Sequence, residues 1–398
     1  MTPFRPMQAL VGVVVMFSTV TQAAESLTAA PVEVSATTVA VPAPAPQPAP
    51  AVSPQPATVS APPPSAVPAV PVVVLGGLIQ GWQEIPQEVG KVPAMRIRRA
   101  ELSARVEVGD GVTGMLVVDP ALIVDDGVTT TPFLTSTTTG KTATGVTAVK
   151  RLSLLKVASV AMDRPFPLVP FVKRLTAGQF KVPFGMEGLK SGGEIDTVER
   201  AMQTALLGWS DLKDLGFMAQ VGTGPFDLWA GGFQGEGQNR AEANNFLNSN
   251  VRATIRPLSW LVVGAAYQEG RTGKAKDFNS HAAGEVSCAW MPGGTPVRLK
   301  GEYALGPQGP KGNAAAVRTG YGHLGVEMWP DHVELVIRYD WLDADAKTPR
   351  NWRTEATGGL SLWLANKRAK FQWNYIRVDE PTPKRRNDLM RVNVQAGF

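Results

Sequence analysis

Apolar and polar residues alternate with a period of two in many short stretches from residue 72 to the end of the chain. Turn residues separate one stretch from the next, as between membrane-spanning β-strands of a closed barrel. The predicted fold is therefore all-β, a 16-stranded antiparallel transmembrane β-barrel, and an even number of strands is usual for single-chain bacterial barrels. The predicted strands are residues 73–82, 95–107, 112–119, 152–162, 171–181, 213–222, 226–234, 249–256, 260–268, 282–291, 295–304, 317–328, 332–341, 353–364, 368–379 and 388–398.

The connections between these strands also alternate, between short and long. A barrel of this class has short turns at its periplasmic end and longer loops outside, whereas a soluble β-sandwich has no reason to sort its loops by side. The short links, rich in turn residues, are 109–111, 222–225, 256–259, 292–294, 329–331 and 366–367, with 163–170 as the one longer exception. The long ones are 83–94, 120–151, 182–212, 235–248, 269–281, 305–316, 342–352 and 380–387.

The last predicted strand has the most regular pattern. From residue 390 apolar residues occupy the even positions, Arg391, Asn393 and Gln395 occupy odd ones, and the chain ends on Phe398. This resembles the terminal signal by which outer-membrane barrels are recognised for assembly. We therefore predict Phe398 as an assembly signal, the bacterial outer membrane as the location, and its lipid and the barrel assembly machinery as partners.

The amino-terminal part of the chain has a different composition. Arg5, the apolar run 9–17 and the small-residue site 21–23 predict a signal peptide over residues 1–23, because the run is far shorter than the roughly 20 residues of a spanning helix. Residues 31–71 contain 13 prolines and a single charged residue, Glu33. Such a segment favours extended polyproline II over a packed core. We predict a disordered periplasmic linker over residues 24–71 and the barrel over 72–398.

The charged residues of the predicted barrel suggest which solutes could pass through it. It contains 38 Lys and Arg against 32 Asp and Glu. If the apolar faces contact lipid, basic side chains line the lumen, and rings of Arg and Lys favour anions. The planar fork of Arg also suits phosphate. In the alternative, these cations pair with acidic residues such as Glu101, Glu302, Glu334 and Asp340 and only fill a polar interior. The predicted lumen cations are Arg99, Arg105, Arg252, Arg298, Lys300, Arg338, Lys370 and Arg391.

The long connection 182–212 contains a helix signal. Asp196 is a candidate N-cap with Glu199 three residues later, and Gly208 can end the helix. We expect this loop to fold into the lumen and narrow it. Lys190 and Arg200, with Lys181 on the adjoining strand, would then lie near the constriction.

Residues 174–184 and 194–201 resemble the phosphate-selective porin O and P family, and residues 95–102 are similar to that family's early Arg-Arg-Ala strand. The resemblance covers the barrel and not the proline-rich segment. It implies a homotrimer of sixteen-stranded barrels, an inward-folded third loop and basic side chains guiding small anionic solutes such as phosphate. On the matching positions, residues 178–181 and the Glu199-Arg200 pair mark the constriction.

The chain departs from the family pattern at two places, which affect the identity of the solute. The loop's usual paired serines are replaced around residues 191–193, and a Thr-rich stretch, 129–147, fills the second long loop.

An enzymatic function has little support in the sequence. His281, His323 and His332 are scattered and none has a second His or a Cys at a metal-ligand spacing. We predict a passive porin, not an enzyme, with no metal, no cofactor and no nucleic-acid partner. The alternatives are a non-conducting outer-membrane barrel that serves as a structural tether, and an outer-membrane lipid-modifying enzyme with a triad of distant residues.

Overall fold

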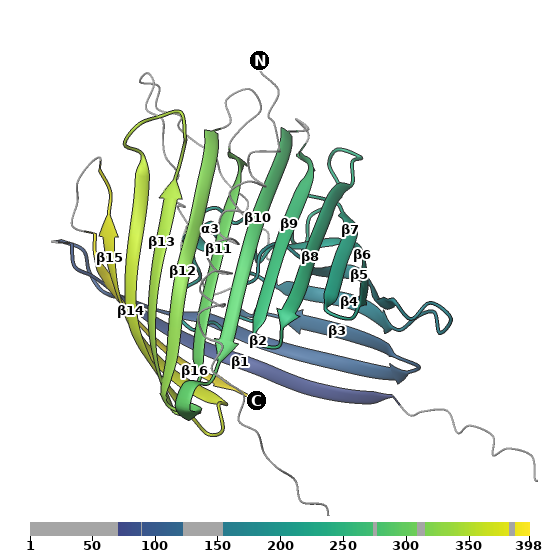
Figure 1. The fold of residues 1–398 in the computed structure, drawn as a ribbon, viewed down its shortest axis with the longest axis horizontal. Coiled ribbons are helices and arrows are strands. Elements are labelled where there is room, and N and C mark those ends of the chain that lie inside the picture. The colour runs from purple at the N-terminus through teal and green to yellow at the C-terminus, as the bar shows by residue number, and fades with distance from the viewer. Residues whose placement is uncertain (1–70, 89, 122–153, 274–276, 309–314, 382–386) are drawn as a thin grey trace, which may run out of the picture. The chain divides into compact units, whose positions relative to one another are not determined.

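The computed structural model describes residues 71–88, 90–121, 154–273, 277–308, 315–381 and 387–398. Sixteen antiparallel strands form a closed barrel in which each strand pairs with its neighbours in sequence and β1 pairs with β16 (Figure 1). The predicted fold class is thus confirmed. The predicted signal peptide, linker and Thr-rich stretch lie outside the described residues. Among the described residues, no helix has both the length and the apolar character needed to cross a membrane.

Each predicted strand corresponds to an observed one. One short helix, α3 (Met202–Ala205), and one 3₁₀ turn, η1 (Pro292–Gly294), are the helical elements with assigned bounds in the described chain. The strands are β1 (Val72–Pro86), β2 (Ala94–Gly109), β3 (Val112–Val118), β4 (Leu155–Asp163), β5 (Val172–Lys181), β6 (Lys213–Thr223), β7 (Phe226–Phe233), β8 (Asn248–Leu258), β9 (Leu261–Thr272), β10 (Asp277–Trp290), β11 (Val297–Gln308), β12 (Ala315–Trp329), β13 (Val333–Asp343), β14 (Trp352–Leu364), β15 (Ala369–Asp379) and β16 (Leu389–Gly397).

The polar face of the strands is the buried one. On β13, Arg338 and Asp340 are 3% and 0% exposed, whereas Ile337 and Tyr339, which alternate with them, are 64% and 53% exposed. A pleated strand points successive side chains to opposite faces, so this part of β13 has an apolar outer face and a charged inner face. This is the reverse of a water-soluble domain and matches a barrel whose outer face contacts lipid.

Several strands are longer than their apolar pattern predicts. β9 continues to Thr272 and β10 begins at Asp277, so both strands extend into the predicted loop 269–281. In the same way, β11 continues to Gln308 and β12 begins at Ala315, inside the predicted loop 305–316. The hydrogen-bonded ladder does not need apolar side chains, and it therefore continues past the apolar stretch.

A β-bulge changes the face that the start of β2 presents. The register of β1 with β2 shifts between Gln80 and Gly81, so that Gln80 lies opposite Arg99, Gly81 lies opposite Ile97, and Arg98 is the extra residue. A bulge of this kind places one additional residue on one strand and breaks the alternation. As a result Arg96 lies opposite Trp82 and shares the inner face with Arg99.

The barrel closes at a seam between its first and last strands. Gly77 N donates to Phe398 O at 3.0 Å, and Phe398 N donates to Gly77 O at 3.1 Å. A Cβ at position 77 would meet the Phe398 ring and lie 2.9 Å from the Glu101 carbonyl oxygen. The seam therefore requires glycine at this position.

Candidate functional site

Residues 182–212, which join β5 to β6, contact the polar face of distant strands. Lys370 Nζ on β15 donates to the carbonyl oxygens of Gly193 and Ile195, both at 2.9 Å. Asn374 Oδ1 on the same strand accepts from Val198 N at 2.7 Å. The strand side chains thus satisfy backbone groups of a segment without regular secondary structure, as a buried loop requires.

Asp196 is the main acidic contact of this loop with β11 and β12. Its carboxylate accepts a hydrogen bond from Lys300, lies 3.3 Å from His323 Nε2 and lies 3.9 Å from Arg298. Burial raises the pKa of Asp196, but His323 and the charges of Lys300 and Lys190 outweigh it and hold this pKa well below its ordinary value. Asp196 is therefore a permanent anion at neutral pH, bound to strand cations.

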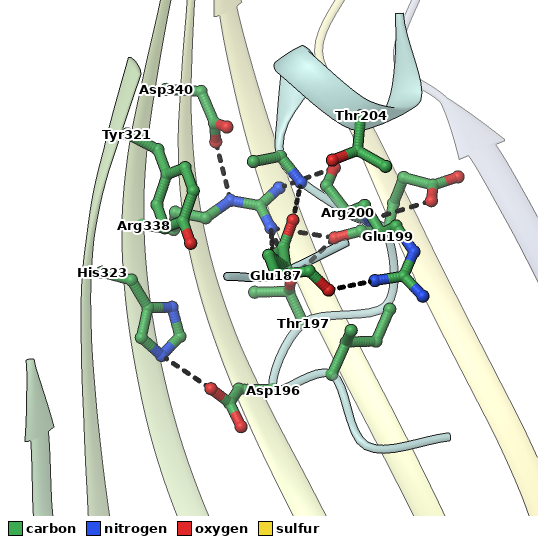
Figure 2. A network of polar contacts seen from close by, with 12 residues as sticks. Glu187, Asp196, Thr197, Glu199, Arg200, Thr204, Tyr321, His323, Arg338 and Asp340 are labelled. Carbon is green, nitrogen blue, oxygen red and sulfur yellow. Dashed lines mark hydrogen bonds and ion pairs between the residues drawn. The ribbon is translucent and has the colours of Figure 1, made fainter. Parts of the chain in front are cut away.

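Arg338 on β13 is the centre of the network between loop and wall (Figure 2). Its guanidinium donates to Asp340 at 2.7 Å on its own strand, to Thr197 Oγ1 at 2.6 Å and to the Glu199 carbonyl at 2.9 Å. A second terminal nitrogen donates to the Arg200 carbonyl at 3.3 Å. Because Arg338 is only 3% exposed, removing any of these acceptors leaves a buried charge less well satisfied.

Loop residues on both sides of this polar stretch make apolar contacts instead. Phe184, Met202 on α3 and Trp209 are each at most 3% exposed. They pack on small and branched side chains of strands β9 to β13, namely Ala266, Ala283, Ala304, Val317 and Leu342.

The predicted helix in this loop is mostly wrong. Only Met202–Ala205 is helical, and the residue at its N-cap is Ala201. Asp196 cannot cap a helix here because its carboxylate is bound by Lys300 and lies beside His323. Tertiary ion pairs have therefore replaced the local capping interaction that the sequence suggested.

Three cations converge on one carboxylate where the loop returns to the wall. Lys181, the last residue of β5, lies 3.0 Å from Asp211; Lys213, the first residue of β6, lies 3.1 Å from it; and Arg200 lies 3.4 Å from it. Arg200 also donates to the carbonyls of Glu187 at 2.6 Å and Lys190 at 2.8 Å. Of the three cations that the sequence assigned to a constriction, the structure thus brings together the side chains of Lys181 and Arg200, with the backbone carbonyl of Lys190. The Lys190 ammonium interacts with Asp196 and Lys300 instead.

A second basic cluster surrounds Trp82 on β1. The guanidinium carbons of Arg98, Arg96 and Arg391 lie 5.0, 5.4 and 6.0 Å from the centre of its ring. Glu84 is the neighbouring carboxylate, 2.7 Å from Arg391 and 3.9 Å from Arg96. Arg96 and Arg98 are not among the lumen cations predicted from the sequence, because a strict period of two from Arg99 puts both on the outer face.

The remaining predicted cations also have acidic partners. Arg105 pairs with Glu107 at 3.1 Å, and Arg252 pairs with Glu285. Arg298 pairs with Glu327 at 2.7 Å and with Glu334. Arg99 lies 3.6 Å from Glu101 and donates to Gln80. These contacts agree with the alternative in which lumen cations are mostly neutralised.

A closed sixteen-stranded antiparallel barrel with an apolar outer face and a polar, charged inner face defines an outer-membrane β-barrel of the porin type. A family model described as phosphate-selective porin O and P matches residues 136–289, which confirms the resemblance over that part of the chain. None of the curated proteins compared with the chain matches it. The protein is thus an outer-membrane barrel with the architecture of a channel.

Solved structures agree on the fold. An OmpF of Salmonella typhi, in complex with daunomycin, is 11% identical, with a TM-score of 0.56 over 82% of this chain and 97% of that one. An anion-selective porin from Comamonas acidovorans is 12% identical, with a TM-score of 0.54 over 83% of this chain and 100% of that one. The outer membrane channel DcaP of Acinetobacter baumannii is 12% identical, with a TM-score of 0.53 over 82% and 97%.

Proposed function

We propose that the protein is an outer-membrane porin through which small anionic solutes, phosphate or other oxyanions among them, diffuse passively. The observation that carries the anion preference is the excess of cations over carboxylates in two clusters beside loop 182–212. Lys181, Lys213 and Arg200 share Asp211, and Arg96 and Arg391 share Glu84. A local excess of fixed positive charge concentrates anions and repels cations.

Loop 182–212 is the proposed constriction. In support of an inward path, it contacts side chains on the inner face of strands far from β5 and β6, such as Lys300, Arg338 and Lys370. A loop that folded outward could not reach that face. Because Arg105, Arg252 and Arg298 are paired with carboxylates, we expect modest selectivity, set at the loop and not along the whole lumen.

The function is tested with purified protein in a planar lipid bilayer. We expect stepwise conductance and, under a salt gradient, a reversal potential of the sign of an anion-selective pore. Lys181→Glu or Arg200→Glu should weaken that potential, whereas Lys367→Glu is a control of equal charge change, in a pair with Asp331 in the short-turn region. Absence of conductance would favour the structural tether, and a cation-selective sign would contradict the proposed preference.

Two further parts of the proposal concern assembly. We propose a homotrimer, in keeping with the trimer form of in-vitro folded OmpT of Vibrio cholerae, a structure 10% identical with a TM-score of 0.52. We also propose that Phe398 is the assembly signal. Phe398 is 68% exposed while its backbone pairs with Gly77, so its side chain is available for recognition. Cross-linking in membranes and the yield of folded Phe398→Ala protein test these two points.

A further inference from the structure

The outer face of strands β11 to β13 carries an arginine without an acidic partner. Arg318 on β12 is exposed on the apolar side of the wall. In the ladder it lies opposite Leu305 and Asp343, but Asp343 Oδ1 accepts from Asp345 N, at 3.3 Å. Within the described part of the chain, the Arg318 side chain has no hydrogen bond and no ion pair. Its charge is therefore available to an anion of the surrounding membrane.

The place of Arg318 along its strand is at the level of the lipid headgroups. The outward side chains of β12 run from Met328 at the short-turn end to Arg318 near the long loops, and those between them are apolar or glycine. This span rises about 33 Å along the strand, or about 25 Å across a membrane at the usual tilt of about 40°. The apolar band of such barrels is also about 25 Å tall, so Arg318 lies at its external boundary.

Two aromatic side chains beside Arg318 offer further donors. Tyr303 on β11 and Trp341 on β13 flank Gly320, and their rings stack with centres 6.4 Å apart and planes 12° apart. A Cβ at position 320 would lie 2.9 Å from the Glu302 carbonyl oxygen and 3.3 Å from the Tyr303 ring, so glycine permits this stack. Neither the Tyr303 hydroxyl nor Trp341 Nε1 has a hydrogen-bond partner among the described residues. Such rings typically lie where hydrocarbon meets headgroups, with their polar atoms toward the headgroups.

The wall below the stacked rings has room for an acyl chain. Gly322, the next outward residue of β12 toward the middle of the membrane, lies directly opposite Gly301 on β11. A Cβ at position 322 would meet nothing within 4 Å. A lipid can therefore lie against the backbone of these two strands while its headgroup is beside Arg318.

We propose that Arg318, Tyr303 and Trp341 bind a phosphate group of lipopolysaccharide, the anionic lipid of the external leaflet. Charge complementarity supports this occupant, because a guanidinium donates two parallel hydrogen bonds to a phosphate and stays charged at any working pH. The two aromatic donors are placed beside the same phosphate. The inference goes beyond the proposed porin function, since it concerns the lipid-facing side of the wall and not the lumen.

The test is the binding of fluorescently labelled lipopolysaccharide to the full chain in detergent, followed by fluorescence anisotropy. Arg318→Gln should bind roughly tenfold more weakly than the unmodified protein, because a charge-assisted hydrogen bond to phosphate is lost. Trp341→Phe keeps a stacked ring but removes one neutral donor, so we expect a loss of about threefold. Arg318→Lys keeps the charge without the planar fork, and its loss should lie below that of Arg318→Gln.

Arg256→Gln is the matched control. Arg256 is also an exposed arginine without an ion pair in the described part of the chain, but it lies near the short-turn end of β8. The same change of charge there should leave lipopolysaccharide binding unchanged. The thermal transition of Arg318→Gln in detergent should equal that of the unmodified protein, because the exposed side chain has no partner to lose.

Two further probes identify the source of the phosphate. Dephosphorylated lipopolysaccharide should bind equally weakly to the unmodified protein and to Arg318→Gln. Inorganic phosphate, at the phosphorus concentration of the lipid, should not displace the labelled lipopolysaccharide, because it has no acyl chain to lie against Gly322. Displacement by inorganic phosphate at that concentration would mean a site for free phosphate and would overturn the proposal.

Other results would also overturn it. One is equal affinity of a folded Arg318→Gln protein and the unmodified one, and another is binding that does not depend on the phosphate groups. A disulfide between two copies carrying Arg318→Cys, in a Cys288→Ser background, would show that a second copy covers this face. Because binding is measured without current, failure of the proposed porin function and failure of this inference are distinguishable.

Discussion

Loop 182–212 is attached to the barrel by two anchors that act through different physical means. The polar anchor, residues 193–200, is bound by charged and amide side chains such as Lys300, Arg338 and Lys370. The apolar anchor, formed by Phe184, Met202 and Trp209, packs on a cluster of small and branched side chains. Apolar burial is non-directional, whereas hydrogen bonds and ion pairs are specific in distance and angle.

The comparison indicates a division of roles within one loop. The apolar anchor can hold the loop against the wall in many slightly different positions, at a gain roughly proportional to the area buried. The polar anchor selects one of these positions, because Arg338 must meet Thr197, Glu199 and Arg200 together. We therefore expect damage to the polar anchor to change the shape of the constriction more than equal damage to the apolar one.

The largest effect is expected from Arg338→Leu. It leaves Asp340 buried at 0% exposure without its ion-pair partner and should lower the opening free energy of the loop by about 3–5 kcal/mol. Hydrogen exchange of the loop amides measures this loss, and single-channel conductance should rise as the loop moves. Arg377→Leu, an exposed change on β15, should leave both unchanged. Unaltered exchange in Arg338→Leu would contradict a central role for this residue.

Met202→Ala tests the apolar anchor. Met202 is 2% exposed, and truncating a buried methionine costs about 2–5 kcal/mol through lost burial and the cavity that remains. Exchange of the loop amides should increase, but conductance should change less than in Arg338→Leu because the polar contacts still fix the position. Met328→Ala, at a residue 61% exposed on β12, is the control. Equal conductance changes in the two anchor variants would end the proposed division of roles.

Asp196→Asn should cost the polar anchor about 1.5–3 kcal/mol, the range for a hydrogen bond to a charged group. The pKa of Asp196 is lowered on folding, so its contribution is complete above the ordinary pKa of about 4 and is lost as pH falls toward the lower, folded value. The difference in loop exchange between the two proteins should thus persist down to about pH 5 and shrink below pH 4. A difference that disappears near pH 6 would be inconsistent with this assignment.

These pH measurements must account for the other charged groups packed around Asp196. The difference between Asp196→Asn and the unmodified protein reports Asp196 together with its coupling to these groups. The neighbours are Lys190 on the loop, Arg298 and Lys300 on β11, His323 on β12, Glu334 on β13 and Lys370 on β15.

The smallest effect is expected from Trp209→Phe. The change keeps an aromatic ring in the apolar anchor and removes the bond from Trp209 Nε1 to Gln308 Oε1, 2.7 Å long. A single neutral hydrogen bond contributes about 1 kcal/mol, so loop exchange should rise slightly and conductance should not change. A loss of loop-opening free energy as large as that of Met202→Ala would show that the apolar anchor also depends on a directional hydrogen bond.

The barrel could be predicted from the sequence because each strand reports its own orientation. Alternation around Arg338 and Lys370 is a local property, and the structure puts both on the inner face as expected. Where alternation breaks, the predicted assignment of side chains to the two faces is wrong. The bulge at Arg98 moves Arg96 to the inner face, and nothing in the residue pattern marks that bulge.

The partners of the loop could not be predicted for a related reason. Asp196 meets Lys300 from 104 positions away, and Arg338 meets Thr197 from 141 positions away. Such contacts depend on the path of the loop through space, which no periodicity encodes. Local signals even pointed to another outcome, because Asp196 and Glu199 form a good capping pattern where no helix begins. Ion pairs with a distant wall outweighed a cap worth about 1 kcal/mol.

The seam at Gly77 and Phe398 has a consequence for the order of folding. Gln80 and Gln395, bonded across that seam, are 315 positions apart, so the ring can be completed only after the last residues have been made. Until then β1 and β16 each present an unpaired edge, which invites association with other chains. Contacts so distant along the polypeptide form slowly, since a large loss of chain entropy precedes them. Shielding these two edges during biogenesis is therefore a requirement that this topology itself imposes.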